Sequence, residues 1–324
     1  MTSAPASAKT LTANEIASML GGELVGDSDV QFSQVQGIKN AQANEVAFFM
    51  STPNEMGQHP SDQDFQAMRD STAGLLLVDA NCPTPTHCHI KVDNPSLAAT
   101  IMAQFWQCRR AQYAAGIHPS AVIEDGAQVA ASAYIGPQCV IGTNSTVGEN
   151  CVLYASVVLY DNVHLGDACV IQANTTIGAD GFGYNWDGKQ HQHMPQIGGV
   201  RIGRGVEIGA NCCIDAGTFE PTEIGDGCIF DNQVQIGHNS KIGRFVIMCG
   251  QVGISGSACI GDGALFAGKS GAAGHLHVGA GAKIAARAAV MSDVEPGQTV
   301  AGQPAVDIKL HQRMMAMMRR NARR

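Results

Sequence analysis

Aromatic residues, long apolar runs and export signals are scarce or absent in this sequence. Aromatic side chains make up 5% of the 324 residues, whereas glycines number 38. This balance favours a thin, repetitive β core over a bulky globular one. No apolar run approaches the ~20 residues that a membrane span needs. The net charge of −8 argues against a dedicated nucleic-acid-binding protein.

The sequence also lacks the features of a disulfide-stapled exported protein and of three common enzyme classes. Its cysteines number 11, an odd count, in a long chain without a signal peptide, so we expect a cytoplasmic protein with reduced thiols. There is no P-loop and no Ser-His-Asp order. The glycines of DGFGY (180–184) do not open a helix after a strand, which argues against a dinucleotide fingerprint.

What the sequence has instead is a six-residue period. Apolar residues, mostly aliphatic, recur at every sixth position over 117–177, 202–214 and 224–290. The residue four positions later in each hexad is small or β-branched, and the residue directly after the apolar one is often glycine. The pattern predicts a short strand with two inward side chains, followed by a corner at which glycine permits the turn.

Three such hexads would close one triangular coil, and coils would stack ~4.8 Å apart. The predicted fold class is therefore a mainly β protein built on a parallel β-helix of hexapeptide repeats, in which each coil contacts its neighbours. Five cysteines fall on the inward small position, where we interpret them as core residues rather than ligands: Cys139, Cys151, Cys169, Cys212 and Cys228.

The period is interrupted twice and is absent at both ends of the chain. Residues 178–201 and the stretch TFEPTE (218–223) should form loops that leave the solenoid, and such loops usually serve binding. We predict three parts: a small N-terminal α/β domain over 1–115, the β-helix over 116–304, and a short, basic, methionine-rich helix over 305–324.

The N-terminal part carries recognisable helix and strand signals. Thr12 and Glu15 form a capping box that predicts a helix ending at Gly21-Gly22. The run GLLLVDA (74–80) predicts a buried strand. A second helix should start at Asn94-Pro95, and its apolar face is predicted to consist of Ala98, Ile101, Met102 and Phe105.

The candidate catalytic residue is His238, in the phrase VQIGHNSKIG (234–243). It occupies an outward position of its hexad, and a neutral imidazole can act as a general base. Gly256 lies one coil further on, so its bare backbone could offer an N–H to a developing oxyanion. His275, two coils and one residue after His238, should lie on the same face. The alternative is that His238 is a surface histidine without a function.

A zinc site is a weaker interpretation of the same region. His238, His275 and His277 could bind zinc together, as β-helical carbonic anhydrases bind a metal between subunits. However, the step between the last two histidines is shorter here than in those enzymes. We therefore expect no metal ligands.

Four phrases on the hexad background resemble one family. ADGFGY (179–184), PQIG (195–198), DNQVQIGHN (231–239) and GQPA (302–305) are similar to phrases of the UDP-3-O-acylglucosamine N-acyltransferases, which act in lipid A biosynthesis in Gram-negative bacteria. The resemblance covers nearly the whole chain. It implies a left-handed β-helix, against the usual rule for crossovers, and a homotrimer with active sites at the subunit interfaces.

The resemblance also implies a reaction and its site. A 3-hydroxyacyl chain would pass from acyl carrier protein to the 2-amine of UDP-3-O-acylglucosamine, with no cofactor. His238 would be the general base, Gly256 the oxyanion-binding residue and His275 a second active-site histidine. The implied substrate-binding residues are His275, Asp231, Asn232, Phe48, Phe49, Phe182, Tyr184 and Met291.

Two regions depart from the family pattern. The family's uracil-binding phrase, Phe-x-x-Asn-Pro-x-Tyr, corresponds here to AFFMSTPNEM (47–56), where Phe48 or Phe49 could stack on a base but the tyrosine is missing. Met291 falls where the family gauges acyl length. Its neighbours are small and predict a groove that admits a different chain length: Ala285, Ala286, Ala288 and Ala289.

Several interpretations stay open at this stage. The basic C-terminal helix could dock the acidic acyl carrier protein, lie on an anionic membrane surface such as the inner membrane, or simply be a solvated helix end. The chain could instead be another sugar-nucleotide acyltransferase that uses acyl-CoA or acetyl-CoA. A β-helical metalloenzyme and a non-catalytic scaffold are further alternatives.

Overall fold

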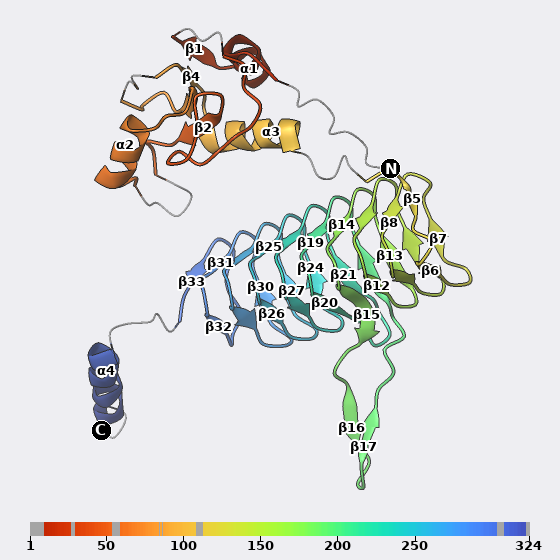
Figure 1. The fold of residues 1–324 in the computed structure, drawn as a ribbon. Coiled ribbons are helices and arrows are strands. Elements are labelled where there is room, and N and C mark those ends of the chain that lie inside the picture. Colours follow the sequence, from red (N-terminus) through yellow and green to blue (C-terminus); the bar gives the residue numbers. More distant parts are fainter. Residues whose placement is uncertain are drawn as a thin grey trace. The chain divides into compact units, whose positions relative to one another are not determined.

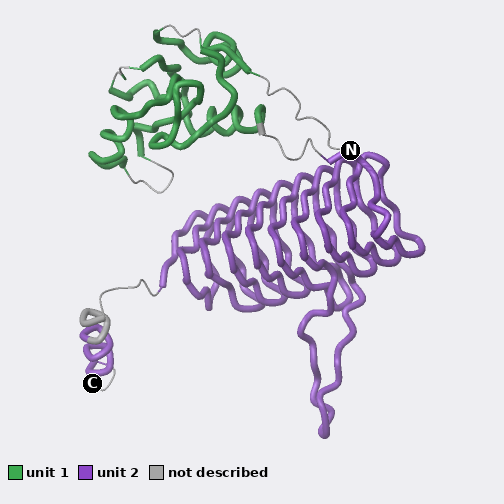
Figure 2. The backbone as a smooth tube through the Cα atoms, in the orientation of Figure 1, with its two compact units in different colours: residues 1–112 green, residues 113–324 purple. Residues whose placement is uncertain are grey.

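The structure is a computed structural model that describes residues 10–26, 30–53, 59–83, 85, 87–107, 113–302 and 308–321. Figure 1 shows the helices and strands along the chain. The chain divides into two compact units, residues 1–112 and 113–324 (Figure 2). The division falls close to the end of the predicted N-terminal domain.

The N-terminal unit contains a four-stranded sheet in the order β1-β4-β3-β2. Strand β1 pairs with β4 in antiparallel fashion, and the other neighbours are parallel. Its strands are β1 (Glu23–Val25), β2 (Val46–Phe49), β3 (Leu75–Val78) and β4 (His89–Lys91), and its helices are α1 (Ala13–Leu20), α2 (Asp62–Arg69) and α3 (Pro95–Gln107). Strand β3 is buried throughout, as the run GLLLVDA predicts.

The predicted helix signals of this unit are largely confirmed. Thr12 and Glu15 form the capping box of α1, and Gly21 ends that helix in the left-handed region with φ 63°. The side chain of Asn94 accepts a hydrogen bond from the backbone of Leu97 at 3.0 Å, which caps α3. Of the residues on the predicted apolar face of α3, Ala98 and Met102 are buried, whereas Ile101 is exposed.

The second unit is a parallel β-helix with three faces (Figure 1). Face 1 consists of β5 (Gly116–Ile117), β8 (Tyr134–Ile135), β11 (Val152–Leu153), β14 (Val170–Ile171), β19 (Glu207–Ile208), β22 (Ile229–Phe230), β25 (Ile247–Met248), β28 (Leu265–Phe266), β31 (Lys283–Ile284) and β33 (Thr299–Val300). Face 2 consists of β6 (Val122–Ile123), β9 (Val140–Ile141), β12 (Val158–Leu159), β15 (Thr176–Asp180), β20 (Cys213–Ala216), β23 (Gln235–Ile236), β26 (Gly253–Ile254), β29 (Gly271–Ala272) and β32 (Ala289–Val290). Face 3 consists of β7 (Gln128–Val129), β10 (Thr146–Val147), β13 (Val163–Leu165), β18 (Val200–Ile202), β21 (Thr222–Ile224), β24 (Lys241–Ile242), β27 (Cys259–Ile260) and β30 (His277–Val278).

The six-residue period forms the core of this unit. Each strand pairs in register with the strand one coil away, as Val147 does with Leu165. The inward apolar and small positions are buried along nearly the whole solenoid, whereas Ile117 in the first coil is exposed. The predicted fold class is therefore confirmed.

The inward cysteines satisfy the backbone of the coils. All five are at most 1% exposed, and each Sγ–H donates to a carbonyl of a corner, as Cys139 does to Tyr154 at 2.9 Å. Ser145 makes the same bond to Tyr160 at 2.8 Å. Burial raises the pKa of the Cys228 thiol to about 11. All five cysteines are buried core residues, as predicted.

The glycines after the apolar positions are needed for a different reason than the predicted one. The residue with positive φ at a corner lies two positions after such a glycine and is often an asparagine or glutamine, for example Gln138 with φ 59° and Asn144 with φ 58°. A Cβ on Gly142 would instead lie 2.6 Å from the backbone carbon of Tyr160 on the next coil. These glycines permit close stacking of the coils rather than the turn.

The first interruption contains a hairpin rather than an irregular loop. Strands β16 (Tyr184–Trp186) and β17 (His191–His193) pair in antiparallel register and extend well clear of the coils (Figure 1). The C-terminal helix α4 spans Ile308–Asn321, and residues 303–307, with most of the GQPA phrase, lie outside the described residues. No helix in the described part of the chain is long and apolar enough to span a bilayer.

Candidate active site

A cavity of about 510 Å³ opens at the corner between faces 2 and 3, which we call corner 2–3. The residues of its lining that matter chemically are Phe182, Asp215, Gln235, His238, Gly253 and Gly256. The structure thus brings together three of the predicted site residues, His238, Gly256 and Phe182. It adds Asp215 and Gln235, which the sequence analysis missed.

The imidazole of His238 lies directly against Gly256. Strands β23 and β26 pair Ile236 with Ile254, so the two residues occupy the same position of successive coils. A Cβ on Gly256 would come within 2.6 Å of Nε2 of His238. Only glycine leaves room for the ring at this corner, as the coil spacing predicts.

The tautomer of His238 is set by Asn239. Oδ1 of Asn239 accepts the backbone N–H of Thr218 at 3.0 Å, and its Nδ2 donates to the carbonyl of Glu220 at 2.9 Å. These backbone partners fix which end of the amide is the acceptor. Nδ1 of His238 lies 3.0 Å from that same Oδ1 and must carry the proton. Nε2 therefore keeps a free lone pair on the side of Gly256.

The N–H of Gly256 is free because a recurrent side-chain cap is missing. At five other corners, the backbone N–H two positions after the apolar residue donates to an Asp or Asn on the next coil. These pairs are Thr143 to Asp161, Glu149 to Asp167, Arg204 to Asp226, Ala210 to Asn232 and Arg244 to Asp262. The capping position for Gly256 is Gly274. No acceptor among the described residues takes the Gly256 N–H.

Asp215 and Gln235 form the polar wall of the cavity. Nε2 of Gln235 donates to Oδ1 of Asp215 at 2.9 Å. Burial raises the pKa of the Asp215 carboxyl above its usual value, and the bond from Gln235 and the nearby His238 oppose that rise. A carboxylate so placed is an acceptor within reach of the same ligand as His238.

The ADGFGY phrase packs over His238. A Cβ on Gly181 would lie 2.5 Å from Cβ of His238, so the backbone of this segment touches the histidine. Phe182 is 84% exposed, and its ring meets Tyr184 edge-on at 5.3 Å. Tyr184 in turn lies 5.3 Å from His193 across the hairpin. The phrase supplies a close cover and an exposed aromatic surface beside the cavity.

His275, Asp231 and Asn232 are predicted site residues of the solenoid that do not line this cavity. His275 is exposed at corner 2–3, where its backbone N–H donates to the carbonyl of Gly256 at 3.2 Å. Asp231 and Asn232 lie at the corner between faces 1 and 2, which we call corner 1–2. Oδ1 of Asn232 caps the backbone N–H of Ala210 there at 2.7 Å. The structure does not bring these two residues to His238 within one chain.

The two aromatic candidates of the N-terminal unit differ. Phe48 is 38% exposed, whereas Phe49 is 6% exposed and packs edge-on against Phe65 with ring centres 5.1 Å apart. Phe49 is a core residue, so its assignment as a base-stacking ring is wrong. Ser51 donates its hydroxyl to Asp79 at 2.6 Å. Phe48 is the ring of this pair that solvent can reach.

Met291 lies on the same corner as His238, further along the solenoid. Face 2 aligns Ile236 with Ile254, Ala272 and Val290, which puts Met291 three coils from Gly237. Its side chain is 76% exposed. Ala288, one of the alanines predicted to line a groove, is only 4% exposed, but it lines a small cavity of about 190 Å³ together with Ala289 and Met291.

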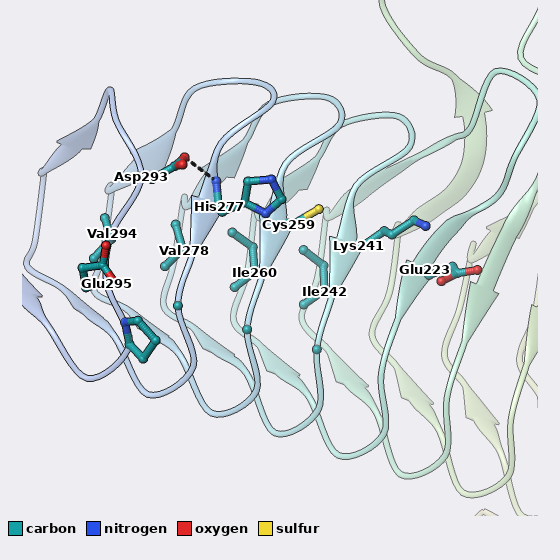
Figure 3. A pocket seen from close by; sticks show the side chains of 14 residues that line it. Glu223, Lys241, Ile242, Cys259, Ile260, His277, Val278, Asp293, Val294 and Glu295 are labelled. Carbon is teal, nitrogen blue, oxygen red and sulfur yellow. Dashed lines mark hydrogen bonds between the residues drawn. The ribbon is translucent and has the colours of Figure 1, made fainter.

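A second cavity of about 510 Å³ lies on face 3 (Figure 3). Glu223, Lys241, Cys259 and His277 come from successive strands of that face, and the His277 N–H donates to Asp293 at 2.8 Å. His277 therefore lies on another face from His238. No group of three or more His, Cys, Asp or Glu side chains suited to a metal ion occurs among the residues that the structure describes.

Comparisons with known proteins agree with the fold. Residues 120–155 and 144–179 match the family model of the bacterial transferase hexapeptide (six repeats). The UDP-3-O-acylglucosamine N-acyltransferase of Alcanivorax borkumensis is 39% identical over 251 residues, which cover 71% of this chain and 70% of that protein. The enzyme of the same name from Herminiimonas arsenicoxydans is 40% identical over 253 residues, covering 72% and 71%.

A solved structure gives the same answer for the fold. The UDP-N-acetylglucosamine acyltransferase of Francisella novicida superposes with a TM-score of 0.54 at 32% identity, covering 61% of this chain and 73% of that chain. The solenoid and these relatives thus define a hexapeptide-repeat acyltransferase with a left-handed β-helix. More narrowly, the chain belongs to the UDP-3-O-acylglucosamine N-acyltransferase family.

Proposed function

We propose that this protein moves a 3-hydroxyacyl chain from acyl carrier protein to the 2-amine of UDP-3-O-acylglucosamine, a step of lipid A biosynthesis. The observation that carries the proposal is the contact at corner 2–3, where Nε2 of His238 lies beside Gly256, whose backbone N–H is uncapped. Amide formation from a thioester needs those two groups side by side.

The reaction uses both groups in one sequence. The neutral amine attacks the thioester carbon while His238 accepts a proton from the nitrogen. The carbonyl electrons move to oxygen, and the oxyanion accepts a hydrogen bond from Gly256. When the intermediate collapses, the C–S bond breaks and the imidazolium returns the proton to the thiolate. The products are the amide and the free thiol, and an activated thioester requires no further cofactor.

The acyl chain has a bare surface on which to lie. The outward positions of face 2 beyond His238 are Gly253, Gly271 and Ala289, which carry almost no side chain. Three coil spacings of ~4.8 Å separate the level of His238 from that of Met291, a length of about 14 Å. Met291 would close this groove and set the chain length.

A homotrimer explains where the remaining predicted residues act. Asp231 and Asn232 lie on corner 1–2, so they would serve the site of a neighbouring subunit rather than their own. Helix α4 carries Arg319 and Arg320 in its last turn, which complement an acidic acyl carrier protein.

The test is an N-acylation assay with acyl carrier protein thioesters of different lengths and UDP-3-O-acylglucosamine. His238→Ala should lower kcat by about 10²–10⁴, whereas the matched control His277→Ala on face 3 should keep wild-type kcat. A wild-type protein that acylates the amine from acetyl-CoA but not from acyl carrier protein would overturn the donor assignment. Equal activity of the two variants would overturn the site.

A further inference from the structure

We infer that Asp215 recognises the acceptor nitrogen, by accepting a hydrogen bond from the 2-amino group while His238 faces the same nitrogen. This inference rests on the proposed function and names the residue that would make its acceptor an amine rather than an alcohol. The argument starts from the position of Asp215 in the coil stack.

Asp215 begins a column of residues that runs along corner 2–3. The register of face 2 aligns Ile214 with Ile236, Ile254, Ala272 and Val290. The residues that follow them are Asp215, Gly237, Ser255, Ala273 and Met291. Asp215 therefore lies one coil from the level of His238, on the side opposite to Met291.

The chemical groups along this corner follow the order of the reacting atoms. A carboxylate comes first, then the base His238, then the free N–H of Gly256, and then the bare surface that leads to Met291. In the tetrahedral intermediate, the nitrogen, the carbon with its oxyanion, and the acyl chain follow one another in the same order. Asp215 is thus at the end where the nitrogen belongs.

The hydrogen bonding of Asp215 leaves an acceptor for the ligand. Gln235 donates to Oδ1, and no described residue donates to Oδ2. No lysine or arginine lines the cavity among the residues that the structure describes. A half-buried carboxylate without a cation is poorly solvated, so an incoming ammonium group would relieve that cost.

The proton count is consistent with this role. An acceptor that arrives as ammonium loses one proton to solvent before attack. One N–H of the neutral amine passes its proton to His238, and the other stays in the amide product. Asp215 accepts a hydrogen bond from the N–H that stays, and therefore takes no proton during the reaction. It positions the nitrogen and favours an amine over a hydroxyl group, whose single proton must go to His238.

The experiment measures the preference between two ligands. Calorimetry at pH 7 gives the Kd of UDP-3-O-acylglucosamine and of the analogue with a 2-hydroxyl group, UDP-3-O-acylglucose, for the full chain. We expect the wild type to bind the amine at least about tenfold more tightly. Asp215→Asn should abolish that preference by weakening amine binding alone. The control Glu223→Gln, which removes a carboxylate from face 3, should retain it.

The outcomes separate the inference from the proposed function. If folded Asp215→Asn keeps the preference, the inference is wrong; Asp215→Ser, measured in parallel, decides the same question should the first variant not fold. If wild type neither binds nor acylates the amino sugar, the proposed function itself fails. If Asp215 only stabilises the fold, Asp215→Asn should weaken the binding of both ligands equally. That result would also overturn the inference.

Discussion

Two corners of the same solenoid treat the same backbone group in opposite ways. At the corner between faces 3 and 1, an aspartate of the next coil caps the exposed N–H, as Asp262 caps Arg244 at 2.8 Å. At corner 2–3 above His238, the corresponding positions are Gly256 and Gly274, and the N–H stays open. The fold is the same at both corners, so the difference lies in a few side chains.

The comparison teaches how a repeat acquires a site. The solenoid stacks backbone N–H groups at its corners and satisfies several of them with its own side chains. Removing a cap leaves a donor at a fixed place, and adding a histidine one coil away gives that donor a partner base. The proposed oxyanion site therefore depends on an open N–H at one corner.

The largest effect that would test the comparison comes from filling the open corner. Gly256→Ala places a Cβ within 2.6 Å of Nε2 of His238, so the ring must leave its position. We expect kcat to fall by about 10²–10³, measured by the N-acylation assay. Gly268→Ala is the matched control at corner 1–2, where the nearest atom to the new Cβ is 3.6 Å away; a comparable loss there would contradict this explanation.

A smaller effect on kcat is expected from removing the Asn239 side chain that orients the imidazole of His238. Asn239 has φ 58°, so Asn239→Gly removes the side chain without backbone strain. Nδ1 of His238 then loses its fixed acceptor, and a fraction of the rings takes the wrong tautomer. We expect kcat to fall by about tenfold to a hundredfold, with thermal unfolding measured alongside. An unchanged kcat would show that the tautomer does not depend on Asn239.

The aspartates that cap backbone N–H groups at other corners should contribute to stability and not to activity. The hydrogen bonds from Arg244, backbone first and then side chain, lower the pKa of Asp262. Because the folded pKa is lowered, the ionised carboxylate stabilises the fold at pH values above the unfolded pKa of 3.8. This stabilisation is lost as the pH falls through the folded pKa. Asp262→Ala should therefore lower Tm at pH 7, with a difference that vanishes in acid, while kcat stays at the wild-type value.

Substitution of Asp215 should change Tm at pH 7 in the opposite direction from substitution of Asp262, and by a smaller amount. Burial raises the pKa of Asp215, so the ionised form costs stability at pH 7, and the cost fades as the pH falls from the folded pKa towards 3.8. Asp215→Asn keeps the oxygen that Gln235 needs and should raise Tm at pH 7 but not in acid. A lower Tm at pH 7 would mean that Asp215 is a stabilising residue like Asp262.

The sequence predicts the parts of the molecule that follow the period. Since coils stack in register, counting residues from His238 was enough to find Gly256. Counting fails where the chain is interrupted: Asp215 and Gly237 share a column but are separated by the insertion around TFEPTE. The same insertion supplies Thr218 and Glu220, which orient Asn239, so Asn239 resembled an ordinary corner asparagine.

The N-terminal unit was harder to predict for a related reason. Its helices α1 and α3 have strong capping signals, whereas strands such as β1 and β4 are three residues long and show no period of their own. Helix α2 begins at a capping box formed by Ser61 and Asp64, but few apolar residues follow it. Phe48 and Phe49 differ only in which side of β2 they occupy, and the sequence alone left both open.

The most direct measurement of the central claim restores the missing cap without adding charge. Asn232 already caps Ala210 through its amide oxygen, so Gly274→Asn should cap Gly256 in the same way, and Gly274→Ala controls for the added Cβ. We predict a single-turnover acyl-transfer rate at least about tenfold lower for Gly274→Asn than for Gly274→Ala. Equal rates in the two variants would contradict the claim that the open N–H of Gly256 binds the oxyanion.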